Sequence, residues 1–193
     1  MTRRVFVVLD RDGTMNVECQ YLSDPNQVEL LPGVTDGLRQ LHEMGLGLVV
    51  ITNQSAIGRG FFDEARLGLI HQRLRELLEA EGVYLDGIYF CPHMPEDDCP
   101  CRKPRPGLLK LAAQELNFDP QACFVIGDKV CDIELGHRVG ATTFLVQTGY
   151  GAQVAAKNAV MPDYVVDDVR DAAQVIKRLL TADEGMKRHA TKC

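Results

Sequence analysis

Residues Val8–Asn16 read VLDRDGTMN, and this stretch decides the fold that we expect. An apolar run over residues 5–9 leads directly to two carboxylates, Asp10 and Asp12, which are followed by a Gly-Thr turn. A buried-type strand that ends in acidic residues and a tight turn is typical of the ligand-binding edge of an open α/β sheet. Two carboxylates buried this close would repel each other, so the pair requires a metal ion, a shared proton or two different chemical roles. The alternative interpretation is a polar turn after a strand.

The rest of the chain alternates between short apolar runs and segments with helical spacing. The apolar runs that predict strands lie at residues 5–9, 46–52, 87–90, 123–126 and 142–146. Helical segments are expected at residues 34–44, 64–81, 106–116, 133–139 and 169–180. This alternation predicts a doubly wound α/β fold with a mostly parallel sheet and no separate cap domain. We expect one folded domain over residues 1–181 and a disordered tail over residues 182–193.

The composition excludes several classes of function. The chain has 193 residues, of which 46% are hydrophobic and 25% are charged, as in ordinary globular proteins. Its net charge of -6 argues against non-specific binding to nucleic acid, which requires a basic face. No apolar stretch approaches the roughly 20 residues of a membrane span, and the N-terminus lacks a signal-peptide cleavage region. We therefore expect a cytoplasmic protein that binds neither nucleic acid nor membranes. We expect a monomer because no large unexplained apolar helix face stands out in the sequence.

Polar side chains also follow the other predicted strands. Thr52 ends the second strand, Lys103 precedes the helix over residues 106–116, and Asp128 follows the fourth strand. Because the carboxyl ends of parallel strands lie at one edge of a sheet, these groups are expected to meet in one crevice with Asp10 and Asp12. Mg²⁺ prefers a few carboxylates together with phosphate oxygens, while a hydroxyl and an ammonium bind the other phosphate oxygens. The set therefore predicts a phosphate site with a hard metal ion.

A second group of residues has the spacing of a metal site. Cys91, His93, Cys99 and Cys101 form the pattern C-x-H-x₅-C-x-C. Three thiolates and one imidazole in a short loop predict a tetrahedral structural zinc site, since closed four-ligand sites hold loops in place. The alternative is four unrelated surface residues in a turn. The loop leads directly to Arg102 and Lys103, so zinc would fix both of them near the crevice.

The four motifs together resemble the haloacid dehalogenase superfamily of phosphotransferases. They are DRDGT at residues 10–14, Thr52, Lys103 and GDKVCD at residues 127–132. The resemblance implies a Rossmann-like core in which Asp10 is the nucleophile and forms an aspartyl-phosphate. Asp12 would be the general acid and then the general base, and Thr52 and Lys103 would stabilise the phosphoryl group in transfer. Mg²⁺ would lie between Asp10, the main-chain carbonyl of Asp12, and Asp128.

The zinc loop narrows the resemblance to one branch of the superfamily. That branch contains the phosphatases of D-glycero-D-manno-heptose 1,7-bisphosphate, which remove the 7-phosphate for lipopolysaccharide precursors, and the histidinol-phosphate phosphatases. The segments TNQSAIGRGFF, GIYFCPH, CRKPRPG and GDKVCDIELG are similar to those of the heptose enzymes over about residues 5–150. The substrate-binding positions that the resemblance implies are Glu18, Cys19, Gln20, Tyr21, Asn53, Gln54, Ser55, Arg102 and Lys129.

The sequence leaves alternatives open. The first is a histidinol-phosphate phosphatase, whose substrate lacks a second phosphate, so that Arg102 would be less needed. The second is a binding module for phosphorylated sugars without turnover, although such modules usually lose the nucleophile that Asp10 would supply. The negative net charge of the chain argues against a third alternative, a polynucleotide 3′-phosphatase.

Overall fold

The computed structural model describes the backbone of residues 3–190 and the side-chain environments of residues 3–182. Its centre is a six-stranded sheet in the order β3-β2-β1-β4-β5-β6, in which every neighbouring pair is parallel. The strands are β1 (Phe6–Leu9), β2 (Gly47–Asn53), β3 (Gly87–Cys91), β4 (Phe124–Gly127), β5 (Thr142–Val146) and β6 (Tyr164–Val166). The expected doubly wound α/β fold is therefore confirmed, and the sheet is wholly parallel.

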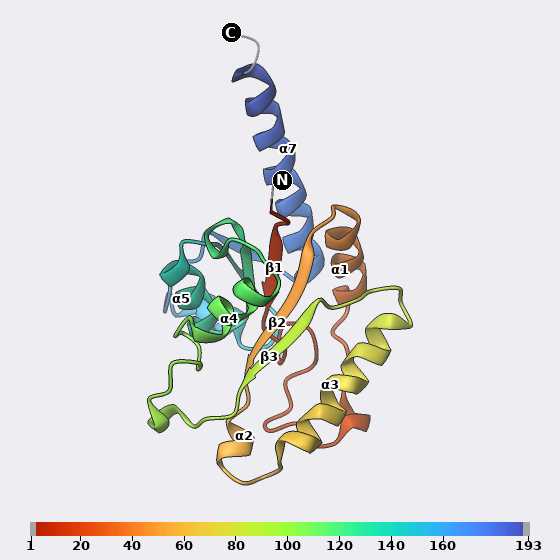
Figure 1. Ribbon diagram of the computed structural model, residues 1–193, viewed down its shortest axis with the longest axis vertical. Coiled ribbons are helices and arrows are strands. Elements are labelled where there is room, and N and C mark those ends of the chain that lie inside the picture. Colours follow the sequence, from red (N-terminus) through yellow and green to blue (C-terminus); the bar gives the residue numbers. More distant parts are fainter. Residues whose placement is uncertain (1–2, 191–193) are drawn as a thin grey trace.

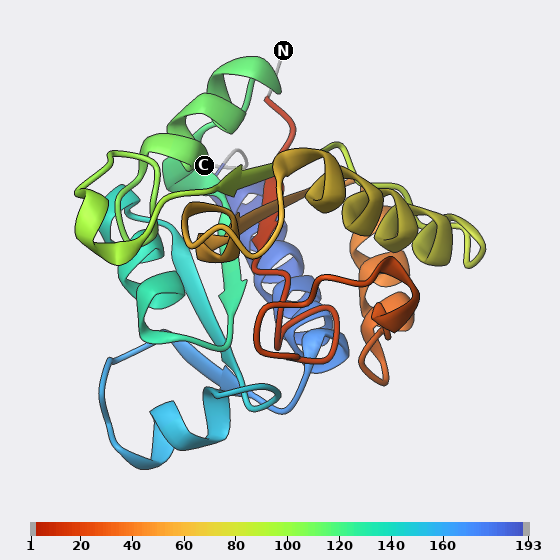
Figure 2. The same cartoon turned by 90° about the horizontal axis from the view of Figure 1, so that it is seen from below.

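Helices cover both faces of this sheet (Figures 1 and 2). The helices are α1 (Val34–Glu43), α2 (Ser55–Gly58), α3 (Glu64–Glu79), α4 (Gly107–Glu115), α5 (Val130–Val139), α6 (Gly151–Ala156) and α7 (Val169–Ala190), with short 3₁₀ helices at Pro25–Gln27, Pro95–Asp97 and Pro120–Ala122. In the view of Figure 2, α4 and α5 lie on one side of the sheet, and α1, α3 and α7 lie on the other. Right-handed connections between parallel strands produce this three-layer arrangement.

A hydrophobic core lies on each face of the sheet, and β1 contributes side chains to both because successive side chains of a strand point to opposite faces. Val7 and Leu9 belong to the core under α1, α3 and α7, whereas Phe6 and Val8 belong to the core under α4 and α5. All four side chains are buried. A strand that is buried on both faces reads as a continuous apolar run, which explains the sequence before Asp10.

The structure adds elements that the periodicity did not predict. Strand β6 at the sheet edge is only three residues long, and α2 and α6 are single short helices. Helix α5 begins at Val130, three residues earlier than expected, because Asp132 accepts a hydrogen bond from the Lys129 amide at the helix start. Helix α7 continues to Ala190, so the expected tail at 182–193 falls partly on this helix and partly outside the described residues. Among the described residues, no helix is both long and apolar enough to cross a membrane.

Candidate active site

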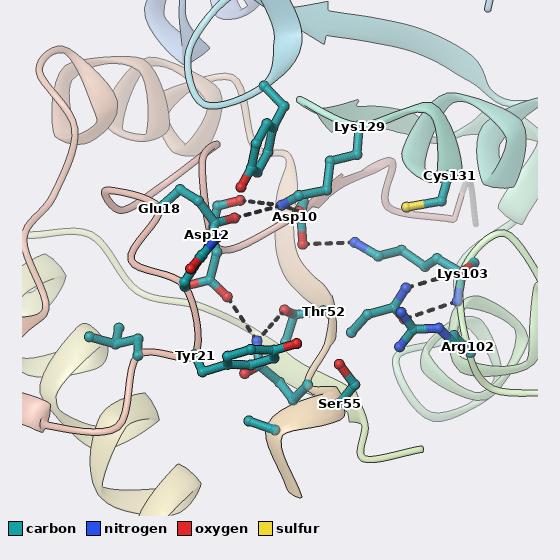
Figure 3. A pocket seen from close by; sticks show the side chains of 16 residues that line it. Asp10, Asp12, Glu18, Tyr21, Thr52, Ser55, Arg102, Lys103, Lys129 and Cys131 are labelled. Carbon is teal, nitrogen blue, oxygen red and sulfur yellow. Dashed lines mark hydrogen bonds and ion pairs between the residues drawn. The ribbon is translucent and has the colours of Figure 1, made fainter. Parts of the chain in front are cut away.

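The carboxyl ends of β1, β2 and β4 open into one cleft with a volume of ≈ 400 Å³. Most of the residues predicted to form the site line this cleft, and Figure 3 shows them together. From the predicted set, the lining residues are Asp10, Asp12, Glu18, Gln20, Tyr21, Thr52, Asn53, Gln54, Ser55, Arg102, Lys103 and Lys129. Its volume is in the usual range for a small-molecule site, and its walls carry charges of both signs.

Asp10 lies between two lysines. The Lys103 ammonium is 2.8 Å from Asp10 Oδ1, and the Lys129 ammonium is 3.5 Å from Asp10 Oδ2 (Figure 3). Burial acts to raise the pKa of Asp10, but the charges of Lys103 and then Lys129 outweigh it and lower the pKa to about 2. Asp10 is therefore ionised at neutral pH, which a carboxylate nucleophile requires.

Lys103 is held from three sides at the base of the cleft. Its buried ammonium contacts the Ile51 carbonyl at 2.6 Å, Asp132 Oδ1 at 2.7 Å, and Asp10. Burial alone would lower the pKa of Lys103, but the carboxylates of Asp10 and Asp132 outweigh it and raise the pKa. The side-chain amide of Asn53 also donates to the Lys103 carbonyl and accepts from the Lys103 amide. Lys103 is thus a fixed positive charge beside Asp10.

Asp12 turns its side chain away from Asp10. Arg11, Asn16 and Gln54 all donate hydrogen bonds to its carboxylate. Burial acts to raise the pKa of Asp12, but the charge of Arg11 and the bonds from Arg11 and Asn16 outweigh it, so that the pKa is lowered. The Asp12 main-chain carbonyl faces the Lys129 ammonium at 2.9 Å instead. The two carboxylates of the DRD motif therefore have different surroundings, which permits different chemical roles.

Asp128 is completely buried beneath the first turn of the DRDGT motif. It accepts hydrogen bonds from the Thr14 hydroxyl at 3.2 Å and the Tyr150 amide at 2.9 Å. Gly13 has a φ of +88°, and a Cβ atom at this position would lie 2.3 Å from Asp128 Oδ2. Glycine is therefore required at this position for both its conformation and its lack of a side chain.

The residues around Asp128 fit a divalent cation. Oxygen atoms of Asp10, Asp128 and Asp132 all lie within 4.8 Å of one another. Burial, and then the charge of Asp10, raises the pKa of Asp128 to about 7. Buried carboxylates whose negative charge is not fully balanced form the kind of oxygen donor set that Mg²⁺ binds. Asp132 thus adds a third acidic group to the Asp10 and Asp128 positions predicted from the sequence.

Thr52 and Gln54 form the wall of the cleft at the end of β2. The Gln54 side-chain amide donates both to the Thr52 hydroxyl and to Asp12 Oδ2, each at 2.8 Å. Gln54 therefore links two groups that were predicted separately, and Ser55 follows it at the start of α2. Arg102 lies across the cleft and donates to the His93 carbonyl at 3.2 Å, which ties it to the zinc-type loop.

The segment Glu18–Tyr21 covers the opposite side of the cleft. Glu18 forms an ion pair with Lys129 at 3.0 Å, and Tyr21 lines the cleft with its ring edge-to-face against Phe61. Tyr21 has a φ of 60°, which is uncommon for a residue with a side chain. Cys19, in the same segment, packs against the hydrophobic core and is not among the lining residues.

The four predicted zinc ligands come together in the loop after β3. Cys101 Sγ lies 3.2 Å from both Cys91 Sγ and His93 Nδ1, and 3.3 Å from Cys99 Sγ. Cys91 Sγ is 3.5 Å from Cys99 Sγ and 3.6 Å from His93 Nδ1. Ligands at about 2.3 Å from a tetrahedral zinc ion lie roughly 3.5 to 3.8 Å apart, so the donor set and its spacing fit zinc.

Comparison with known proteins agrees with this geometry. Residues 100–172 match the HAD-hydrolase-like family model. The D-glycero-β-D-manno-heptose-1,7-bisphosphate 7-phosphatase of Haemophilus influenzae is 39% identical over 188 residues, which cover 93% of this chain and 99% of that protein. The enzyme of the same name from Escherichia coli K12 is 40% identical over 181 residues, which cover 89% and 93% of the two chains.

The chain belongs to the heptose-bisphosphate phosphatase family. A solved structure supports this assignment: the D,D-heptose 1,7-bisphosphate phosphatase of B. bronchiseptica, complexed with magnesium and phosphate, has a TM-score of 0.84 and 32% identity. The match covers 90% of this chain and 98% of that one. The predicted membership in the haloacid dehalogenase superfamily is confirmed, and the chain is a hydrolase of the phosphatase type.

The site of this heptose-bisphosphate phosphatase homologue also contains several residues for which the sequence predicted no role. Arg11 contacts Asp12, Asp132 contacts Lys103, and Tyr150 lies with its ring 5.4 Å from the Lys129 ammonium. Cys131 also lines the cleft. Their positions in the sequence beside Asp10, Asp12 and Asp128 were the available signal for Arg11, Cys131 and Asp132. Nothing in the sequence indicated Tyr150, which reaches the site from the loop after β5.

Proposed function

We propose that this protein is a Mg²⁺-dependent phosphatase that removes the 7-phosphate of D-glycero-β-D-manno-heptose 1,7-bisphosphate through an aspartyl-phosphate intermediate. The observation that supports this most is the contrast between Asp10, an ionised carboxylate beside Lys103, and Asp12, whose carboxyl is held apart by other donors. The names of the relatives described above support the choice of sugar and anomer.

Asp10 acts first as the nucleophile. One of its carboxylate oxygens attacks the phosphorus of the 7-phosphate, and the bond between phosphorus and the sugar oxygen breaks. Lys103 and the Thr52 hydroxyl lie where they can bind the phosphoryl oxygens, so their charge and dipole are fixed before the reaction begins. The product of this step is a phosphoryl group on Asp10, and the hard displacement is divided into two easier ones.

Asp12 handles the proton in both steps. The lowered pKa of Asp12 keeps its carboxyl group mostly ionised in the free protein, so the protonated fraction is the form that gives a proton to the departing sugar oxygen. The resulting carboxylate then takes a proton from the attacking water. The water oxygen bonds to phosphorus while the bond from phosphorus to Asp10 breaks, which releases inorganic phosphate and restores the Asp10 carboxylate. A residue that supplies this base favours rapid hydrolysis over retention of the phosphoryl group.

Asp10, Asp128 and the Asp12 carbonyl would hold Mg²⁺, and Asp132 lies beside them. When bound, the ion would neutralise the repulsion between the nucleophile and the phosphate. The positively charged side chains in the cleft wall are suited to binding the part of the substrate outside the 7-phosphate. Arg102 is the candidate for the second phosphate because a guanidinium can bind it with two parallel hydrogen bonds.

Zinc would have a structural role, with Cys91, His93, Cys99 and Cys101 as its ligands. The loop they form carries Arg102 and Lys103, and the His93 carbonyl already accepts a hydrogen bond from Arg102. A metal ion bound by these four ligands would order the loop before substrate binds. The binding of substrate would then not have to supply the free energy needed to order the loop.

The decisive experiment is a comparison of kcat/KM, in the presence of Mg²⁺, for the two anomers of the heptose bisphosphate and for histidinol phosphate. We expect a preference for the β-anomer of at least about a hundredfold, or about 2.7 kcal/mol of transition-state discrimination. Asp10→Asn is the control and should abolish turnover while the protein stays folded. A preference for histidinol phosphate would overturn the substrate assignment, and turnover by Asp10→Asn would overturn the mechanism.

A further inference from the structure

Arg11, the central residue of the Asp-Arg-Asp motif, is one of the most deeply buried large side chains of the protein, with 1% of its surface exposed. Its guanidinium faces the Asp12 carboxylate with two parallel hydrogen bonds. Arg11 Nε lies 3.0 Å from Asp12 Oδ1, and Arg11 Nη2 lies 2.7 Å from Asp12 Oδ2. Such a bidentate pair fixes both the distance and the plane of a carboxylate.

Two further donors complete the surroundings of the Asp12 carboxylate. Asn16 Nδ2 donates to Oδ1 at 3.0 Å, and Gln54 Nε2 donates to Oδ2 at 2.8 Å. Each oxygen therefore accepts two hydrogen bonds in the substrate-free protein, so proton transfer at Oδ2 requires that the bond from Gln54 be given up. Gln54 shares its amide with the Thr52 hydroxyl, whereas both bonds from Arg11 go to Asp12 alone. Arg11 is thus the donor that determines the orientation of Asp12.

The burial of Arg11 is poorly explained by stability. Its third guanidinium nitrogen, Nη1, is buried and has no hydrogen-bond partner among the described residues. Removing a guanidinium from water is costly, and a buried ion pair often contributes no more to stability than apolar side chains of the same volume. An incompletely satisfied charge in the interior, directly behind a group that lines the cleft, is therefore better explained by what it does to Asp12.

We propose that Arg11 is a positioning residue that holds the Asp12 carboxyl group in the orientation needed for proton transfer to the sugar oxygen and from the attacking water. Arg11 itself keeps all of its protons, and the proton moves only between Asp12, the leaving oxygen and water. This inference rests on the proposed role of Asp12 as general acid and base. It predicts that loss of Arg11 damages those steps that need a proton from or to Asp12.

Kinetics on two substrates can distinguish a misplaced Asp12 from a general loss of structure in an Arg11 variant. The departing oxygen of a sugar phosphate needs a proton, whereas the nitrophenolate of p-nitrophenyl phosphate leaves without one. Transfer of the phosphoryl group to Asp10 should therefore stay fast with the aryl phosphate, but the following attack of water still needs Asp12 as a base. A variant with a misplaced Asp12 should release one equivalent of nitrophenolate per enzyme in a burst, followed by slow turnover.

The experiment compares Arg11→Met, Arg11→Lys and Asp12→Asn with the unchanged protein by pre-steady-state kinetics on both substrates. For both Arg11 variants we expect kcat on the heptose bisphosphate to fall about a hundredfold, with KM little changed and a nitrophenolate burst retained. Lysine should not restore the activity, because it cannot form the two parallel bonds. Arg75→Met is the matched control. Among the described residues, Arg75 donates only to the Leu85 carbonyl, which lies outside the cleft, so this variant should behave like the unchanged protein.

Equal losses on the two substrates without a burst, or unchanged kinetics, in an Arg11 variant that unfolds at the normal temperature would overturn the proposal. Arg11→Lys keeps the test valid if Arg11→Met does not fold. If Asp12→Asn itself loses activity equally on both substrates, the proposed role of Asp12 is wrong. If Asp12→Asn shows the burst and the Arg11 variants do not, only the inference about Arg11 fails.

Discussion

The Lys129 ammonium lies 2.9 Å from the main-chain carbonyl oxygen of Asp12. The same nitrogen is 3.5 Å from Asp10 Oδ2 and 3.6 Å from Asp128 Oδ1. These three oxygens belong to the residues that we propose as Mg²⁺ ligands. Lys129 and a divalent cation therefore interact with the same group of oxygens, and their positive charges repel each other.

Lys129→Met should bind Mg²⁺ at least about tenfold more tightly, because the competing and repelling ammonium is removed. The same variant should be less stable without metal, since Asp10, Asp128 and Glu18 would lose the cation they share. Isothermal titration with Mg²⁺ and thermal unfolding in a chelator measure the two effects. Lys157→Met, at an exposed position after α6, is the control and should change neither quantity. An unchanged Mg²⁺ affinity in Lys129→Met would refute the competition.

Binding of Mg²⁺ should depend on pH through Asp128. Burial and the charge of Asp10 raise the pKa of Asp128 to about 7, so a proton competes with the metal ion below that pH. The affinity should weaken by up to about tenfold per pH unit below pH 7 and level off above it. Titrations between about pH 6 and about pH 8 measure this slope. A flat profile across that range would contradict the raised pKa.

The same group determines how the stability of the metal-free protein varies with pH. An unfolded chain loses the Asp128 proton near 3.8, whereas the folded protein keeps it until about 7. Between these values the folded state binds more protons, so the contribution of Asp128 to the free energy of unfolding falls as pH rises and is constant above pH 7. Chemical denaturation in a chelator should show this decline, and saturating Mg²⁺ should remove it.

Cys99→Ser should lower the zinc content and the thermal stability together. The four donor atoms all lie within 4.8 Å of one another, and a tetrahedral site that loses one of its four ligands binds zinc much more weakly. Elemental analysis and thermal unfolding of the same sample test this. Cys19→Ser is the matched control because Cys19 packs beside the core, away from the cluster. A normal zinc content in Cys99→Ser would show that the site is not closed by these four residues.

Arg102→Ala should reduce kcat/KM for the heptose bisphosphate about a hundredfold and affect a sugar monophosphate much less. The reason is that Arg102 lines the cleft and is a candidate for the second phosphate, which the monophosphate lacks. Steady-state kinetics on the two substrates give the ratio. Arg105→Ala is the control, since Arg105 contacts Asp98 and the Cys99 carbonyl and does not line the cleft. Equal losses on both substrates would remove the proposed role of Arg102.

Local sequence patterns were enough to predict the parallel fold, the DRDGT turn and the candidate ligands of the zinc-type loop. Phe6–Leu9 is apolar at every position because β1 is buried on both faces, and this pattern is visible without any knowledge of its neighbours. The four metal-type ligands lie within eleven residues of one another, so their spacing alone limits their geometry. Strand β6 was not predicted, because three residues are too few to show a periodic pattern of hydrophobic side chains.

Tertiary structure alone decided which groups surround each carboxylate. Lys103 is 93 residues from Asp10 in the sequence, and Lys129 is 119 residues from it, yet both contact its carboxylate. Their approach depends on the strand order β3-β2-β1-β4, which places the loops after β3 and β4 on either side of Asp10. The sequence cannot show that Asp12 turns toward Arg11 and Gln54, because a side-chain orientation follows from the donors that packing brings within reach. The identities of the site residues could therefore be predicted from the sequence, but the contacts between their side chains could not.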